Sequence, residues 1–152
     1  MKPLNDILAW QAQQQQSEKK AGHFVLFHGP SVRDMFATAQ LLGKEFGKVV
    51  HEVPLSKVIS KYIGETEKNL AALFKKAERE DHILFFDEAD VLFSKRTRVK
   101  DAHDKYANGE INYLLKRIEA YPGLVILATN LKENIDPAFI RHFHAILHIP
   151  KL

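Results

Sequence analysis

The sequence predicts an α/β protein, a three-layer αβα sandwich in which helices cover both faces of a five-stranded parallel sheet. From Phe24 onward, strand-like apolar runs alternate along the chain with helix-like amphipathic segments. Two of the runs, ILFF and LVILA, are apolar at every position instead of every second one. Continuous apolar strands are typical of a parallel sheet that is buried on both faces.

The N-terminal stretch 4–20 predicts a helix with Leu4, Ile7, Leu8 and Trp10 on one side. We therefore divide the chain into an N-terminal helix and linker, 1–22, and an αβα domain, 23–152. The strands predicted in this domain cover 23–27, 49–53, 83–86, 124–128 and 145–149. The helices predicted between them cover 33–46, 66–80, 108–120 and 136–141.

Length and composition fit a single globular domain, because the chain has 152 residues and ordinary apolar and charged fractions. No apolar run approaches the roughly 18 residues of a membrane span, and the N-terminus is Gln-rich. We expect a cytoplasmic protein without a membrane partner. The net charge of +3 arises from basic residues scattered among acids, which predicts a solvated surface and no nucleic-acid binding.

Metal binding through sulfur is excluded because the chain has no cysteine. Three histidines, His142, His144 and His148, lie close together near the C-terminus. No acid or cysteine stands beside them, so we expect packing or surface histidines instead of a metal site.

Ligands of open parallel sheets bind beyond the carboxyl ends of the strands, so the residues that follow each strand are site candidates. Asp87 and Glu88 follow the apolar run ILFF directly. In phosphate-loop enzymes one such acid helps to hold Mg²⁺, and a neighbouring acid can polarise the attacking water. Capping of the next helix is the alternative role. Two adjacent acids at the buried end of a strand favour the catalytic interpretation.

Four motifs resemble those of the AAA+ ATPase family in order and spacing. They are KYIGETEKNL at 61–70, FFDEAD at 85–90, ATN at 128–130 and DPAFIR at 136–141. The likeness extends over nearly the whole chain, and VKDAHDKYAN at 99–108 resembles a bacterial subgroup that includes ATPases linked to contractile, phage-tail-like particles. The resemblance implies ATP and Mg²⁺ as ligands, homo- or hetero-oligomeric AAA+ subunits as partners, and a protein as the candidate substrate.

The resemblance also implies roles for individual residues. Asp87 resembles the Mg²⁺ ligand, Glu88 the catalytic base and Asn130 the polar sensor of the γ-phosphate. Arg141 resembles the arginine finger that reaches a neighbouring subunit's nucleotide. Many relatives carry a second arginine beside it, and here His142 occupies that position.

The loop formed by Tyr62, Ile63 and Gly64 resembles the substrate-gripping loop that faces the central pore of an AAA+ ring. A tyrosine packed over a turn is the structural alternative. AAA+ modules normally continue from the fifth strand into a helical lid, whereas this chain stops two residues after Pro150. The resemblance therefore implies a large AAA+ subdomain, of the phosphate-loop NTPase fold, with the helical lid absent.

The stretch HGPSVRDMF at 28–36 stands where the phosphate-binding loop is expected. A working loop reads G-x-x-x-x-G-K-[ST] between a strand and a helix. Counted from Gly29, Asp34 replaces the second glycine, Met35 the lysine and Phe36 the hydroxyl residue. The residues expected at this nucleotide site are Gly29, Pro30, Ser31, Asp34, Met35 and Phe36.

Each replacement opposes phosphate binding for a separate reason. Met35 removes an ammonium whose hydrogen bond would contribute about 1.5–3 kcal/mol, and Phe36 removes the Mg²⁺-binding hydroxyl. The Asp34 carboxylate repels phosphate by about 3–4 kcal/mol at an effective dielectric of about 20. A total loss of roughly 5 kcal/mol or more, against about 8 kcal/mol for a micromolar site, predicts millimolar or weaker binding.

Met35 and Phe36 also extend the apolar stripe of the predicted helix 33–46, and we expect them to pack into the space that a nucleotide would fill. The leading interpretation is an AAA+ module with a degenerate phosphate loop, a pseudoenzyme that acts as an interaction or regulatory subunit or as a remnant of a remodelling ATPase. The alternative is a functional, protein-remodelling ATPase whose loop binds phosphate in a rearranged mode, with Arg33 replacing the lysine.

Overall fold

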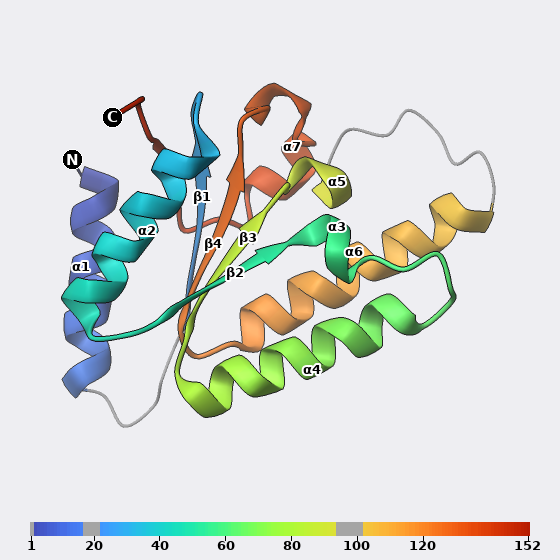
Figure 1. Ribbon diagram of the computed structural model, residues 1–152, viewed down its shortest axis with the longest axis horizontal. Helices are drawn as coiled ribbons and strands as arrows, with labels where there is room; N and C mark the ends of the chain where they lie inside the picture. The colour runs from blue at the N-terminus through green and yellow to red at the C-terminus, as the bar shows by residue number, and fades with distance from the viewer. Residues whose placement is uncertain (1, 17–21, 94–101) are drawn as a thin grey trace.

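A computed structural model describes the backbone of residues 2–16, 22–93 and 102–152. Its centre is a five-stranded sheet with the order β2-β3-β4-β1-β5, in which every pairing is parallel (Figure 1). The predicted fold class is confirmed. The strands are β1 (His23–His28), β2 (Val50–Pro54), β3 (Ile83–Asp87), β4 (Leu124–Thr129) and β5 (Ala145–His148).

Four long helices flank the sheet, each close to a predicted range or, for α6, extending it toward the N-terminus. They are α1 (Lys2–Gln16), α2 (Val32–Phe46), α4 (Glu65–Glu80) and α6 (Ala102–Ala120). The short elements are α3 (Leu55–Val58), α5 (Asp90–Phe93), the 3₁₀ turn η1 (Lys132–Asn134) and α7 (Pro137–Ile140). Of these short elements only α7 was predicted. Within the described ranges, none of the helices has the length and apolarity that crossing a bilayer requires.

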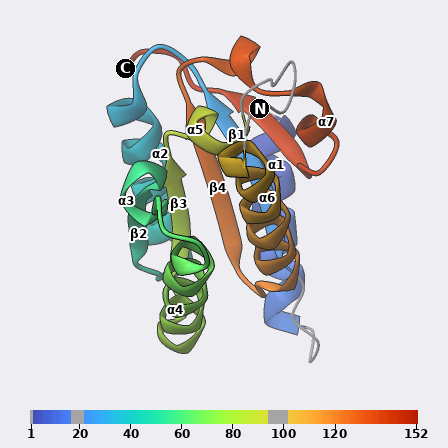
Figure 2. The same cartoon turned by 90° about the vertical axis from the view of Figure 1, so that its right-hand side faces the viewer.

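Each face of the sheet has its own hydrophobic core, which explains why the central strands are apolar at every position. One core joins the sheet to α1 and α2 and includes Ile7, Met35, Phe27 and Phe85. The other joins it to α4, α5 and α6 and includes residues such as Phe74. Figures 1 and 2 show α1 and α2 on the opposite side of the strands from α4 and α6.

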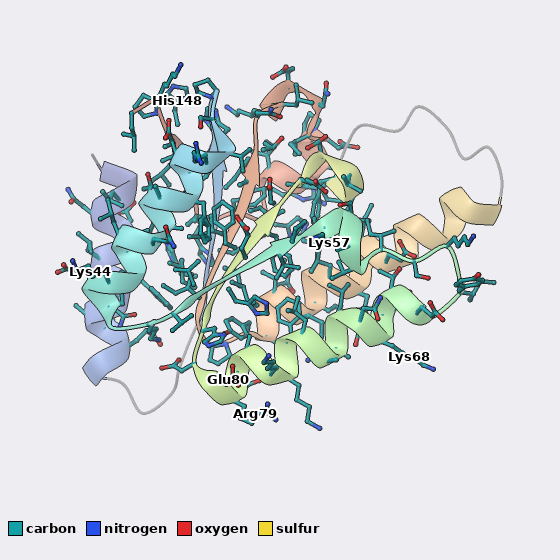
Figure 3. All side chains as sticks on the ribbon, viewed as in Figure 1. Lys44, Lys57, Lys68, Arg79, Glu80 and His148 are labelled. Atoms are coloured by element: carbon teal, nitrogen blue, oxygen red, sulfur yellow. The ribbon has the colours of Figure 1, made fainter. Side chains whose placement is uncertain are left out.

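Helix α1 packs against the sheet through Ile7 and Trp10, which are buried together with Gln11. The prediction that Leu8 shares this side is wrong, because Leu8 is 39% exposed. The side of α1 that packs against the sheet therefore carries positions 4, 7, 10 and 11, one of the spacings that a helical period of 3.6 residues allows. Longer charged side chains of other helices, such as Lys44, Lys68 and Arg79, point outward (Figure 3).

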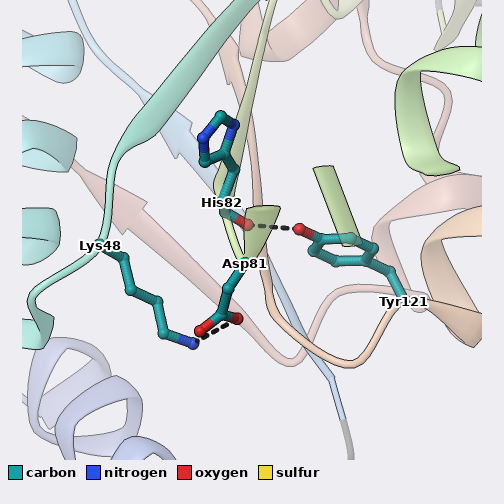
Figure 4. A network of polar contacts seen from close by, with 4 residues as sticks. All are labelled: Lys48, Asp81, His82 and Tyr121. Carbon is teal, nitrogen blue, oxygen red and sulfur yellow. Dashed lines mark hydrogen bonds and ion pairs between the residues drawn. The ribbon is translucent and has the colours of Figure 1, made fainter. Parts of the chain in front are cut away.

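A polar network ties together the segments that enter the amino ends of the strands (Figure 4). Lys48 Nζ lies 3.1 Å from Asp81 Oδ1, and the Tyr121 hydroxyl donates a hydrogen bond to the carbonyl oxygen of His82. Burial, and secondarily the nearby Asp81 and Glu78 charges, raise the pKa of Tyr121, so it remains a neutral donor. These contacts hold the end of the sheet that lies away from the candidate site.

Candidate functional site

An open pocket of about 480 Å³ lies at the carboxyl ends of β3 and β4, where the topology predicts a ligand site. The side chains around it come from β3, α5, the end of β4 and the start of α2. The lining residues are Val32, Asp87, Glu88, Asp90, Val91, Thr129 and Asn130. The predicted acids and the predicted sensor Asn130 therefore share one pocket. We call it the acidic pocket.

Asp87 and Glu88 stand at the exit of β3. Asp87 Oδ1 accepts the Glu88 N–H at 2.6 Å. Burial raises the pKa of Asp87, the hydrogen bond from Glu88 opposes this, and the charges of Glu88, Glu52 and Asp90 raise it further. The carboxyl group of Asp87 is therefore in an environment of uncompensated negative charge.

The side chain of Glu88 points toward α3. Its backbone has a positive φ of 62°, which turns the chain sharply after the strand. Its Oε2 accepts the N–H of Ser56 at 3.2 Å, in the first turn of α3. The residue predicted as catalytic base thus has an ordered carboxylate beside the pocket.

Two further polar residues of this pocket were not singled out from the sequence. Thr129 is 1% exposed, and its hydroxyl donates to Asp90 Oδ1 at 3.3 Å while accepting the Leu131 N–H at 3.0 Å. These bonds fix the turn that presents the exposed Asn130. The available signal was the last acid of FFDEAD and the threonine of ATN.

The predicted phosphate loop is largely helical, because α2 begins at Val32, inside the stretch HGPSVRDMF. Ser31 caps this helix: its Oγ accepts the N–H of Asp34 at 3.2 Å. The carbonyl oxygen of Ser31 accepts the N–H of Met35 at 3.1 Å. Two backbone donors of the stretch are therefore used within the helix.

Met35 and Phe36 pack against the sheet beneath α2. Met35 is fully buried in the core shared with Phe27 and Phe85, and the ring of Phe36 meets the ring of Phe85 edge-on at 5.2 Å. Neither side chain lines the acidic pocket. Of the stretch HGPSVRDMF, Val32 is the residue that does. The expectation that Met35 and Phe36 fill the ligand space is corrected in this respect: both side chains lie on the side of α2 that packs against the sheet.

The residues after β5 pass close to the stretch HGPSVRDMF. The N–H of Ile149 donates to the carbonyl oxygen of His28 at 2.7 Å, and a Cβ on Gly29 would lie 2.1 Å from the carbonyl oxygen of Ile149. Gly29, at φ +155°, therefore serves a close backbone approach. The N–H of Leu152 donates to Asp34 Oδ2 at 3.0 Å. Pro30, between these contacts, is exposed.

The predicted pore loop projects from the entry to α4. Tyr62 is 61% and Ile63 72% exposed, so the alternative of a tyrosine packed over a turn is not what the structure contains. Gly64 has a φ of +84° and precedes the first residue of the helix. The Ser60 hydroxyl donates to Glu65 Oε2 at 2.8 Å and accepts the Tyr62 N–H at 3.1 Å. The loop is ordered at its base and apolar at its tip.

Arg141 lies at a second pocket, of about 380 Å³, between α6 and α7. Its lining residues are Asn112, Leu115, Lys116, Glu119, Ala138, Phe139, Arg141 and His142. His142 Nδ1 lies 3.6 Å from Glu119 Oε1. Arg141 does not line the acidic pocket of its own chain. We call this second site the basic pocket.

Two of the C-terminal histidines lie against histidine rings of β1, one pair stacked and the other tilted. The ring of His144 lies 4.7 Å from that of His23, and its Nδ1 accepts the N–H of Phe24 at 3.0 Å. The ring of His148, near the top of Figure 3, lies 5.1 Å from that of His28. Within the described part of the chain, no group of three potential metal ligands comes together.

The two halves of this site fit Mg-ATP differently. Asp87, Glu88 and Asn130 supply the oxygen donors that Mg²⁺ prefers, in an open pocket. The stretch after β1 offers no ammonium, buries Met35 in the core and presents the Asp34 carboxylate. The cation half of the site fits the ligand, and the phosphate half does not.

The arrangement defines an αβα nucleotide-hydrolase fold with an acidic site at the sheet's carboxyl edge. Residues 25–151 match the family described as "ATPase family associated with various cellular activities (AAA)". The chain belongs to this family, whose members generally bind ATP with Mg²⁺.

Bacterial and archaeal proteins are among those similar to this chain. An uncharacterized AAA family ATPase of Sinorhizobium fredii is 34% identical over 81% of this chain. A proteasome-activating nucleotidase of Aeropyrum pernix is 32% identical over 83%, and a cell division cycle protein 48 homolog of Archaeoglobus fulgidus is 30% identical over 82%. The chain corresponds to only 37%, 32% and 18% of the lengths of these three relatives.

Proposed function

We propose that this chain is a AAA+ module with a degenerate phosphate loop, which binds nucleotide weakly and acts as an interaction or regulatory subunit of a ring-forming remodelling ATPase. The observation that carries the proposal is the helical start of α2 at Val32, with Met35 buried in the core. A phosphate loop must present free backbone N–H groups and a lysine to the phosphates. Here the N–H groups of Asp34 and Met35 bond to Ser31 instead.

The remaining motifs support a role in an assembly. Members of the family generally form oligomers, and an oligomer is where an exposed Tyr62 loop and an outward Arg141 would act. We propose that Tyr62, Ile63 and Gly64 contact a protein substrate and that Arg141 reaches a neighbouring subunit's nucleotide. Both side chains at the loop tip are more than half exposed, which suits such contacts.

Two finer assignments belong to the same proposal. A link to contractile, phage-tail-like particles rests on the stretch 99–108, which lies outside the residues whose side chains the structure describes. The second is a cytoplasmic location.

The second candidate function is a working ATPase that remodels proteins. The ordered Glu88 carboxylate and the shared pocket of Asp87 and Asn130 favour it. In that case phosphate would bind in a rearranged mode, with Arg33, which is exposed at the start of α2, replacing the lysine.

Phosphate release separates the two functions. Wild type and Glu88→Gln are compared at saturating Mg-ATP. The Gln side chain has nearly the same size as Glu88 but carries no carboxylate. The pseudoenzyme proposal predicts equal, background-level release from both proteins. Release that depends on Glu88 would favour the working ATPase.

Co-assembly tests the partner role. The chain is mixed with a lid-bearing AAA+ homologue from the same source, and complexes are measured by light scattering. Incorporation of wild type that is weakened by Arg141→Ala supports the subunit role. Absence of any mixed complex would leave a remnant without a partner as the better interpretation.

A further inference from the structure

The residues after β5 lie along the stretch HGPSVRDMF and contact it near both of its ends. We infer that residues 149–152, which we call the strap, close this stretch against anions, and that the Asp34 carboxylate holds the strap in place. The inference deepens the proposed function, because it adds a removable obstacle to the residue changes that weaken phosphate binding. It rests on that function only for the claim that phosphate would bind at this stretch.

One end of the strap is fixed by Ile149. Its N–H donates to the carbonyl oxygen of His28 at 2.7 Å, and its side chain is buried in the core that contains Met35. Its carbonyl oxygen lies so close to Gly29 that a Cβ there would approach it to 2.1 Å. The strap therefore places the negative end of a peptide dipole at the residue with which the phosphate-loop pattern begins, and this dipole repels an anion.

The other end of the strap is held by Asp34. The N–H of Leu152 donates to Asp34 Oδ2 at 3.0 Å, and a hydrogen bond to an ionised acceptor is stronger than one between neutral groups. Ser31 and Thr38 also bond to this residue, but they bind its backbone N–H and carbonyl oxygen. Within the described ranges, the Asp34 side chain therefore has the strap as its one hydrogen-bond partner, and a substitution at this position can remove the strap contact alone.

Between these two contacts the strap is exposed to solvent. Pro150, Lys151 and Leu152 are all exposed, and Figures 1 and 2 show the C-terminal end of the chain beside the first turn of α2. Pro150 has no N–H, and the N–H of Lys151 has no partner in the part of the chain that the structure describes. The bond to Asp34 therefore decides whether residues 150–152 stay on the stretch, and a short exposed segment of this kind opens at low cost.

Stabilisation of the helix dipole is the alternative role of Asp34, because the residue lies in the first turn of α2. Two substitutions separate the roles. Leu152→Pro removes the N–H that Asp34 accepts and leaves the carboxylate at the helix start. Asp34→Asn does the reverse, because its amide oxygen still accepts the N–H of Leu152 while the negative charge is lost.

A spin label on the strap measures its release. The chain has no cysteine, so Lys151→Cys provides a single labelling site at an exposed residue. Electron paramagnetic resonance should show mainly ordered label, and Asp34→Ala or Leu152→Pro should raise the ratio of mobile to ordered label about fivefold. Combining the two substitutions should add nothing further, since both remove the same bond. Asp34→Asn, and the control Glu45→Ala at the other end of α2, should leave the label ordered.

Mg-ATP titrations followed by NMR test whether the strap obstructs anions. Leu152→Pro keeps the repulsive Asp34 carboxylate, so the expected fall of about threefold in its dissociation constant comes from strap release alone. Asp34→Ala removes both the contact and the charge, and it should bind more tightly than Asp34→Asn. Label that is as mobile in wild type as in Asp34→Ala, or unchanged Mg-ATP affinity in Leu152→Pro, would overturn the inference. Micromolar Mg-ATP binding by wild type would instead contradict the proposed function, and it would leave the result for the ligand-free label unchanged.

Discussion

The N–H of Met35 donates to the carbonyl oxygen of Ser31 at 3.1 Å and closes the first turn of α2 where a phosphate loop would otherwise run. The sequence change from lysine to methionine and the local backbone conformation thus agree. In this helical conformation the Met35 side chain is fully buried, and removal of its apolar surface from water is favourable. Helix and core packing therefore support each other at the expense of a phosphate site.

Restoring the phosphate-loop residues should destabilise the ligand-free protein. Met35→Lys combined with Phe36→Thr places an ammonium and a hydroxyl in or beside a core where Met35 is fully buried. We expect a loss of about 3 kcal/mol or more in the free energy of unfolding. Urea denaturation followed by circular dichroism measures it. Leu41→Lys, on the exposed side of the same helix at 66% exposure, is the control and should change little. An unchanged midpoint for the double variant would show that the packing of Met35 contributes nothing.

Removing the cap of α2 should weaken its first turn. Ser31→Ala deletes the Oγ that accepts the Asp34 N–H and should cost about 1 kcal/mol. Ser31→Asp, which supplies another capping oxygen, should retain most of the stability. Thermal melts of the three proteins in parallel test this. If the Asp and Ala variants melt alike, the cap is not what holds Val32 in the helix.

Neutralising Asp87 should stabilise the protein at neutral pH. Burial raises the pKa of Asp87 above its ordinary 3.8, so the folded state binds this proton more tightly than the unfolded state. The contribution of Asp87 to stability therefore falls as the pH rises from 3.8 through the raised pKa of the folded state, and it stays low above that pKa. We expect Asp87→Asn to melt higher than wild type at pH 7, and the gap to shrink toward pH 4. Melting temperatures across this range test the sign, and a lower melting temperature for Asp87→Asn at pH 7 would contradict it.

Acidification should loosen the contact between α1 and the sheet. The ring of His23 lies between Trp10 at 5.4 Å and His144 at 4.7 Å. Burial and the neighbouring His144 lower the pKa of His23 to about 4, with Asp6 opposing. The unfolded state then binds the extra proton first, so stability is lost as pH falls from 6.5 toward 4. His23→Phe keeps a stacking ring and cannot titrate, and it should lose less stability between pH 7 and pH 5. An identical pH dependence in both proteins would exclude His23 as a cause.

The sheet, its parallel sense and the acidic pocket were predictable from sequence because they follow from local signals. Each of two apolar runs predicts a strand that is buried on both faces and followed by a polar residue. They are ILFF, before Asp87, and LVILA, shortly before Asn130. The replacement of the phosphate-loop lysine by Met35 and of the hydroxyl residue by Phe36 was likewise predictable, because both positions follow from counting the loop pattern from Gly29.

Features that depend on tertiary geometry could not be predicted in this way. The helical period alone did not decide whether Leu8 or Gln11 faces the sheet, and the structure buries Gln11. The short α3, whose Ser56 N–H bonds Glu88, has too few residues to show a periodic pattern. The Ser31 cap that begins α2 at Val32 was not predicted either, although the helix itself was predicted from residue 33.

Calorimetric titration of the ligand-free chain with Mg-ATP and Mg-ADP tests the central claim most directly. The helical start of α2 and the buried Met35 predict a dissociation constant in the millimolar range or weaker. A micromolar dissociation constant, accompanied by phosphate release that Glu88→Gln abolishes, would contradict the claim that this stretch is a phosphate loop in position only.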